Sequence, residues 1–147
     1  MKIKNKKAFF NYEILESFET GIVLTGAEVK SIKTGRANIG DAHVKVLNNE
    51  LWLINAEIPK YPFCNDEFYD SNRTRKLLVK RKEISQIESK VKQKRLTLIP
   101  LSLYIVRGKI KVEVGLGKGK RDYEKKEALK ERDLDRELLN ESKKYVV

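Results

Sequence analysis

The chain has 147 residues, which is enough for one ordinary domain with a hydrophobic core. Its 32 Lys and Arg residues outnumber its 21 Asp and Glu residues, and the net charge of +11 favours an anionic partner, most often nucleic acid or an anionic membrane face. The apolar runs are too short to span a membrane, the first residues lack a secretory signal pattern, and the single Cys64 cannot form an internal disulfide. These features predict a cytoplasmic protein.

Most of the elements that the sequence predicts are strands. The alternation of side chains over residues 9–14 predicts a half-buried strand. Residues 43–47 and 51–58 flank the sequence Asn-Asn-Glu and predict a hairpin. Residues 96–106 and 109–116 flank an Arg-Gly pair and predict a second hairpin.

The second hairpin carries two further signals. Pro100 has no amide hydrogen, so its strand needs an edge position or a bulge there. In the last strand one face is polar and the other is apolar, and the apolar face consists of Ile110, Val112, Val114 and Leu116.

Two helices interrupt the strands. Residues 26–35 have apolar side chains at helical spacing, an acid early, lysines late, and Gly35 just past the expected end. Residues 80–94 also show helical spacing, and residues 77–79 form either a preceding strand or the first turn of this helix. About six strands and two short helices without βαβ alternation predict a mainly β fold, a small antiparallel barrel of the oligonucleotide-binding style.

The sequence predicts two parts, a body of residues 1–117 and a charged tail of residues 118–147. The segment GLGKGK lacks the spacing of a phosphate-binding loop, so its glycines predict a flexible exit from the last strand. The tail has ten basic and eight acidic residues and few apolar ones, too few to offset an ordering cost of about 1–2 kcal/mol per residue. We expect it to be disordered when free and to fold on a partner, the alternative being a solvated tail without a role.

Catalytic chemistry has little support in the sequence. The single histidine, His43, lies in a strand pattern with no evident Ser or Cys nucleophile. No cysteine or histidine spacing indicates a metal site, and no motif indicates a cofactor. We therefore expect neither enzyme activity nor a metal nor a cofactor.

Nucleic-acid binding has better support, because the basic residues come in groups with polar and aromatic companions. Lys and Arg neutralise phosphates, Asn, Ser and Thr reach sugars or base edges, and aromatic rings stack on exposed bases. Any one group could equally be a solvated face, but four on one small chain favour RNA binding. The groups are residues 2–12, 30–38, 71–76 and 117–126.

Four segments resemble the small protein B (SsrA-binding protein) family in order and spacing: NKKAFFNYEI, GIVLTGAEVKSIKTGRANIGDAHV, RTRKLLVKRKEI and GLGKGKRDYEKK. The resemblance covers nearly the whole chain. Two positions depart from the family pattern. Ser71 stands where the family commonly has proline, and Tyr123 with Glu124 stands where several members have His-Asp.

The resemblance implies a bacterial partner of transfer-messenger RNA in trans-translation, the rescue of ribosomes stalled on messages without a stop codon. The body would grip the tRNA-like domain of that RNA. The tail would enter the empty mRNA channel near the small-subunit decoding centre and fold there into a helix, and the free protein would be a monomer away from membranes. Two other classes stay open: a general oligonucleotide-binding or ribosome-associated single-strand RNA-binding module, and an enzyme acting on RNA.

The resemblance also implies site residues. RNA contacts would come from Asn5, Lys6, Lys7, Glu28, Lys30, Lys33, Arg36, Asn38, Arg73, Arg75 and Lys76. Ribosome contacts would come from Lys118, Lys120, Arg121, Tyr123, Lys125 and Lys126. An acid in an RNA site is unusual: Glu28 would accept hydrogen bonds from base amino or ribose hydroxyl groups, hold a neighbouring lysine, or only favour the helix start.

Overall fold

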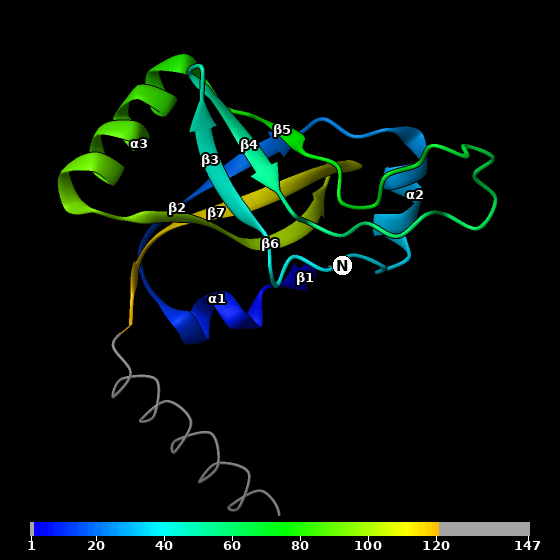
Figure 1. The fold of residues 1–147 in the computed structure, drawn as a ribbon, viewed down its shortest axis with the longest axis horizontal. Coiled ribbons are helices and arrows are strands. Elements are labelled where there is room, and N and C mark those ends of the chain that lie inside the picture. The colour runs from blue at the N-terminus through cyan, green and yellow to red at the C-terminus, as the bar shows by residue number, and fades with distance from the viewer. Residues whose placement is uncertain (1, 121–147) are drawn as a thin grey trace, which may run out of the picture.

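The structure is a computed structural model that describes residues 2–120, and it consists of one bent antiparallel sheet with three helices (Figure 1). The strands follow the order β1-β6-β7-β2-β5-β4-β3, and within the described residues no pairing joins the two edge strands, so the sheet is open. The strands are β1 (Lys2–Lys4), β2 (Tyr12–Ile22), β3 (His43–Leu47), β4 (Glu50–Ile54), β5 (Arg75–Leu78), β6 (Thr97–Val106) and β7 (Lys109–Gly119). The helices are α1 (Lys6–Asn11), α2 (Gly26–Lys33) and α3 (Arg81–Lys94).

The mainly β fold class and both hairpins are confirmed, but β4 ends at Ile54 and not at the predicted residue 58. The β3–β4 turn places Asn48 at φ 51° and Asn49 at φ 60°, and the β6–β7 turn places Arg107 at φ 50° and Gly108 at φ 77°. Two successive residues with positive φ form the turn whose twist matches paired strands. Asn and Gly tolerate this conformation well, which is why the first turn was readable from sequence.

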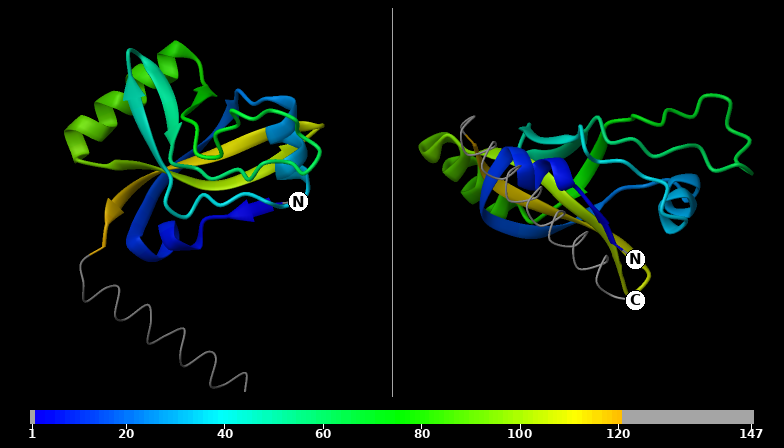
Figure 2. Two further views of the ribbon diagram at one scale, coloured as in Figure 1. Left: turned by 45° about the vertical axis from the view of Figure 1, so that its right-hand side comes forward. Right: turned by 90° about the horizontal axis from the view of Figure 1, so that it is seen from below.

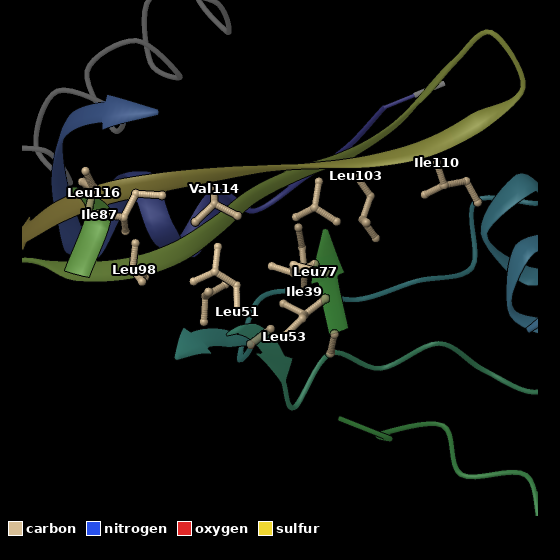
Figure 3. Packing of buried hydrophobic residues seen from close by; sticks show 14 of the residues in the cluster. Ile39, Leu51, Leu53, Leu77, Ile87, Leu98, Leu103, Ile110, Val114 and Leu116 are labelled. Carbon is tan, nitrogen blue, oxygen red and sulfur yellow. The ribbon is translucent and has the colours of Figure 1, made fainter. Parts of the chain in front are cut away.

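The core lies inside the bend of the sheet. Figure 3 shows Leu51 and Leu53 of β4 facing Val114 and Leu103 of the long strands. The predicted apolar face of the last strand is buried along its whole length. Helix α3 covers part of the same core with two isoleucines, and the segment of residues 77–79 that the sequence left open is strand β5 through Leu78.

The predicted bulge at Pro100 is present, and it divides the apolar side chains of β6 between two clusters. The register of β6 against β7 shifts between Pro100 and Ser102. Leu98 and Leu103 therefore face the main core, whereas Leu101 packs with a smaller cluster beneath α1. Strand β6 lies between β1 and β7, but its pairing with β1 covers only Ser102–Tyr104. Pro100 therefore lies next to the bulge and beyond the end of that pairing, where its missing amide donor leaves no ladder bond with β1 unmade.

The strand predicted over residues 9–14 is wrong for its first half. Residues up to Asn11 belong to α1, and β2 begins at Tyr12. The side-chain Oδ1 of Asn5 accepts a hydrogen bond from the amide of Ala8 at 3.1 Å, which caps the helix. This cap and the burial of Ala8 determine the conformation, and the short alternation of side chains does not.

The interpretation of the glycines as a flexible exit is also wrong within the described residues. Gly115 and Gly117 are buried inside β7, which pairs with β2 as far as Gly119. A Cβ at Gly115 would stand 2.8 Å from Leu101 Cδ1, and one at Gly117 would stand 2.9 Å from Ile99 Cδ1. These positions lack side chains because the cluster beneath α1 occupies the space.

Replacement of Gly117 by Val should lower the free energy of unfolding by about 1–3 kcal/mol, because the new side chain overpacks the small cluster beneath α1. Gly119→Val is the matched control, because a Cβ there has nothing within 4 Å. Urea unfolding of both variants measures the difference. Equal midpoints for the two variants would contradict this account of the glycines.

Candidate nucleic-acid interface

Helix α2 begins with a complete capping box. The hydroxyl of Thr25 accepts from the Glu28 amide at 3.3 Å, and the Glu28 carboxylate accepts from the Thr25 amide at 2.9 Å. Gly35, at φ 79°, lies just past the helix end, as the sequence predicts. Both ends of this short helix are thus fixed by local hydrogen bonds and backbone conformation.

The carboxylate of Glu28 also joins α2 to β5 and to the segment before it. Its Oε1 accepts from Arg73 Nη2 at 2.6 Å, and its Oε2 accepts from Arg75 Nε. The side chains of Glu28 and Arg75 are 1% and 0% exposed, and that of Arg73 is 39% exposed. One buried acid therefore holds two cationic side chains that are far from it in sequence.

Three further donors of Arg75 are occupied by backbone oxygens. Its guanidinium donates to the carbonyls of Ala56 at 2.9 Å, Arg73 at 3.0 Å and Ser71 at 3.0 Å. A buried charge is tolerated only when it is paired and hydrogen-bonded in this way. Arg75 thus fixes the path of the chain on both sides of the long loop that enters β5.

The pKa of the Glu28 carboxyl lies below its ordinary value. Burial is the largest single influence and raises the pKa, but the Thr25 amide and the guanidinium groups of Arg73 and Arg75 together lower it by more. The carboxylate therefore stays ionised through the neutral and mildly acidic range.

The long loop of residues 59–74 lies beside α2 at one end of the molecule (Figure 2). Ser31 of α2 donates to the carbonyl of Pro59 at 2.6 Å, and the Lys30 ammonium lies 5.6 Å from the centre of the Tyr61 ring. Phe63 and Phe68 extend from this loop and are 81% and 92% exposed. Exposed aromatic rings beside lysines can stack on unpaired bases while the cations contact phosphates.

Several residues expected to contact RNA gather on the exposed surface around α2. Lys30, Lys33, Arg36 and Asn38 are exposed, and Arg73 is partly exposed beside them. Lys6 and Lys7 are exposed on α1, where Lys7 pairs with Asp41 at 3.1 Å. Lys76 pairs with Glu50 at 3.1 Å.

Three other expected contact residues, Asn5, Glu28 and Arg75, are buried, so their side chains offer no exposed surface for an RNA contact in this structure. Glu28 and Arg75 are fully used in the ion cluster described above. Asn5 caps α1 and donates to the carbonyls of Ile39 at 3.0 Å and Pro100 at 2.8 Å. The hydrogen bonds of these three buried residues hold in place the segments that carry the exposed cations.

The expected ribosome contacts lie only partly within the described residues. Lys118 is exposed and pairs in register with Glu13. The amide of Lys120 donates to the Asn11 carbonyl at 2.9 Å, and its ammonium donates to the Phe9 carbonyl at 3.1 Å. Outside the described residues lie Arg121, Tyr123, Lys125 and Lys126.

The loop aromatics Tyr61, Phe63 and Phe68 were not singled out from the sequence. Their signal was available: four aromatic residues fall within residues 61–69, a stretch with two prolines nearby and no strand or helix periodicity. Apolar rings in a segment that cannot join the core are expected at the surface.

The bent open sheet, with a basic helix and an aromatic loop at one end, defines a small β-sheet protein of the oligonucleotide-binding kind. Within residues 2–120 no helix is long and apolar enough to cross a membrane, and no group of three or more His, Cys, Asp or Glu residues could hold a metal ion. Comparison with known proteins gives the family directly. The family described as SmpB protein matches residues 2–144, and the chain belongs to the SmpB family.

Individual relatives agree with this assignment. An SsrA-binding protein of Dehalococcoides mccartyi is 48% identical over 139 residues, which cover 95% of this chain and 81% of the relative. One of Streptococcus mutans is 44% identical over 142 residues, covering 97% and 92%. A solved structure described as "tmRNA-SmpB: a journey to the center of the bacterial ribosome" is similar with a TM-score of 0.69 and 40% identity, covering 87% of this chain and 94% of that one.

Replacement of Glu28 by Gln should lower the free energy of unfolding by about 3–5 kcal/mol at neutral pH, because Arg75 would keep its charge without a buried partner. The pH dependence should change too. A carboxyl with a lowered pKa in the folded state contributes stability that is complete above the unfolded pKa and is lost as pH falls through the folded pKa. The variant should lack this acid-range loss.

Urea unfolding between neutral pH and about pH 3, below the model-peptide pKa of Glu, measures both effects. Glu16→Gln is the control, because Glu16 is exposed and pairs with Lys90 at the surface. That variant should stay close to the wild type in stability. An equal loss in both variants would contradict a central role for the buried cluster.

Proposed function

We propose that this protein binds the tRNA-like domain of transfer-messenger RNA and delivers that RNA to stalled ribosomes for trans-translation. The single observation that carries the proposal is the match to the SmpB family over residues 2–144. The relatives' name, SsrA-binding protein, and the structural neighbour described as tmRNA-SmpB in the ribosome support both partners. The site of action would be the cytoplasm, and the protein would act by binding and not by catalysis.

The surface around α2 is the proposed contact for the tRNA-like domain. Lys30, Lys33 and Arg36 would neutralise phosphates, and the Asn38 segment would hydrogen-bond to sugars or base edges. Arg73 would contact the same RNA, and its hydrogen bond to the buried Glu28 would hold the Arg73 side chain in position. A protein recognises the shape of a folded RNA when cations held in fixed positions match the spacing of its phosphates. The buried cluster of Glu28, Arg73 and Arg75 would hold the cations around α2 in such positions.

The tail of residues 118–147 is the proposed probe of the empty mRNA channel. Lys118, Lys120, Arg121 and Tyr123 would contact ribosomal RNA at the channel mouth, joined by Lys125 and Lys126. An intact message would exclude the tail sterically, which gives specificity without base recognition. The tail would order as a helix against the channel wall.

A second candidate is a general single-strand RNA-binding module. The exposed Phe63 and Phe68 favour it, because aromatic rings beside cations stack on any unpaired base. Binding of the tRNA-like domain in competition with an unstructured oligonucleotide of equal length separates the two. Equal affinities would favour the general module.

The combined substitution of Lys30, Lys33 and Arg36 by Gln should weaken binding to the isolated tRNA-like domain. The slope of log affinity against log salt should fall by about 2–3, because three phosphate contacts are lost. Filter binding at several salt concentrations measures the slope. Three Gln substitutions on α3, at Arg81, Lys82 and Lys94, remove equal charge elsewhere and should leave this slope unchanged.

The wild-type protein provides the reference for that experiment. If the body neutralises about five phosphates, affinity should fall by roughly two to three orders of magnitude between about 50 and 200 mM salt. A nearly flat dependence would show that the net charge plays no part in binding.

Replacement of Leu134 by Pro should slow peptide tagging on ribosomes that carry a message without a stop codon, while binding to the free RNA stays at the wild-type level. An interior proline costs a helix about 3 kcal/mol and removes an amide donor. Leu134→Met is the control, because it keeps an apolar helix-forming residue. Wild-type tagging by the proline variant would contradict a helical role for the tail.

A further inference from the structure

The loop of residues 59–74 carries the two most exposed large apolar side chains of the described residues. Phe68 is 92% exposed and Phe63 is 81% exposed, whereas the next in order, Leu47 and Leu78, are both 52% exposed. The loop extends away from the sheet (Figure 2). A single exposed apolar residue needs no explanation, but two nearly bare phenyl rings five residues apart indicate a surface that a partner covers.

Hydrogen bonds close this loop at its base. The Tyr69 hydroxyl donates to the Ile58 carbonyl at 2.6 Å, and the Ile58 amide donates to the Ser71 carbonyl at 2.9 Å. Arg75 of the buried cluster donates to the same Ser71 carbonyl at 3.0 Å. A partner therefore meets a loop whose two ends are already joined, which lowers the entropy cost of binding.

Local contacts also order residues 61–72, the aromatic segment of the loop. The rings of Tyr61 and Phe63 meet edge to face with centroids 5.6 Å apart, and the Cys64 amide donates to the Tyr61 carbonyl at 2.9 Å. The Phe68 amide donates to Oδ1 of Asp66 at 2.9 Å. The one edge-to-face contact leaves most of the Phe63 surface bare, so both phenyl rings present open faces to a partner.

The charge of the aromatic segment is opposite to that of the chain. Residues 61–72 contain three acids and no Lys or Arg, whereas the whole chain has a net charge of +11. All three acids are exposed, and none forms an ion pair with another described residue; they are Asp66, Glu67 and Asp70. The bare rings therefore lie among carboxylates that no described cation neutralises.

These carboxylates decide which partner the rings fit. Rings alone would suit unpaired bases, but a base stacked on Phe63 or Phe68 would bring its phosphate close to the acids, and like charges repel. An anionic membrane would be repelled in the same way. A guanidinium group suits both features, because it stacks on an aromatic face and donates paired hydrogen bonds to a carboxylate. The aromatic segment therefore fits an arginine-rich protein segment.

The base of the loop has the other charge. Lys30 of α2 lies 5.6 Å from the centre of the Tyr61 ring, and Arg73 bonds to Glu28 where the loop ends. These cations belong to the surface proposed for RNA, whereas the acids lie in the segment between them. An RNA on the α2 surface and a basic protein segment on the aromatic segment would therefore be bound side by side.

We propose that the aromatic segment binds an arginine-rich segment of a partner protein, whose guanidinium groups stack on Phe63 and Phe68 and bond to the neighbouring acids. The proposal goes beyond the proposed function, because it assigns a protein partner to a surface separate from the RNA-binding one. The contact is small and exposed. It is therefore a transient contact, whose specificity comes from charge complementarity.

The probe is a synthetic peptide of about ten residues with arginine at alternate positions and glycine and serine between them. Two matched peptides replace arginine by lysine or by its neutral isostere citrulline, and a short oligouridine tests RNA. Each probe is titrated into the full-length protein at about 50 mM salt, where charge effects are strong. Amide chemical shifts locate the contact, and fluorescence anisotropy measures the affinity.

Three variants of the full-length chain identify the groups that bind. The ring variant is Phe63→Ser with Phe68→Ser. The acid variant is Asp66→Asn, Glu67→Gln and Asp70→Asn, which keeps the side-chain oxygens that accept backbone amides. The control variant replaces by Gln three exposed acids elsewhere that form no ion pair with a described residue, Glu13, Glu57 and Glu83. Urea unfolding verifies that each variant is folded.

The arginine peptide should shift the amides of Phe63 and Phe68, the lysine peptide should bind more weakly, and the citrulline peptide should not bind. The ring variant should bind the arginine peptide about tenfold more weakly, because two exposed cation–π contacts are lost. The acid variant should lose about threefold to tenfold and most of the salt dependence. The control variant should stay within about twofold of the wild type.

Equal affinity of the wild type and the ring variant for the arginine peptide would overturn the proposal, and so would binding of the citrulline peptide. Oligouridine that shifts the amides of Phe63 and Phe68 would overturn it by identifying RNA as the partner. Self-association in sedimentation that the ring variant abolishes would overturn it too, because the partner would then be a second copy of the chain. The peptide assay contains no transfer-messenger RNA, so failure of the proposed function would appear elsewhere, in the RNA-binding experiments.

Discussion

The structure depends on one buried carboxylate that has to remain ionised. Glu28 closes the capping box of α2 and at the same time holds Arg73 and Arg75. Burial alone would favour the neutral acid, and the two guanidinium groups with the Thr25 amide reverse that preference. Because each partner belongs to a different segment, the charge fixes the helix, strand β5 and the loop before it relative to one another. This cluster orients α2 and thereby determines where the exposed lysines of that helix lie.

The distribution of cations follows from that arrangement. Arg75 pairs with Glu28 in the interior, and Arg73 pairs with the same acid but is partly exposed. Lys30, which lies beside the Tyr61 ring, and Lys33 are both exposed to an external anion. The net charge alone suggests one undivided basic surface, whereas the fold separates α2 from α3 by the length of the central strands (Figure 1). The positive charge is therefore divided between separate surfaces of the body.

The elements that the sequence predicts correctly are those determined by near neighbours. The two-residue turns, the capping of α2, the helical spacing of α3 and the alternation of β7 all act within a few residues. The sequence does not predict the burial of residues whose contacts join distant segments. The Glu28–Arg75 pair joins residues 47 apart, and Asn5 bonds to a carbonyl 95 residues away. Glu28, Arg75 and Asn5 carry no local signal of burial, so all three were expected at an RNA surface.

The alternate glycines of β7 have a structural role that their local sequence does not predict. Alternate glycines before a charged segment predict flexibility, yet Gly115 and Gly117 are the positions where β7 passes beneath the side chains of Ile99 and Leu101. The absence of a Cβ lets β7 continue in register with β2 to Gly119, and Lys120 then bonds to the backbone at the end of α1. The position of Lys120, the last residue that the structure describes, is therefore fixed by strand pairing and by two hydrogen bonds to α1. The proposed tail would start from this fixed residue, and the position of the body would then determine where it begins.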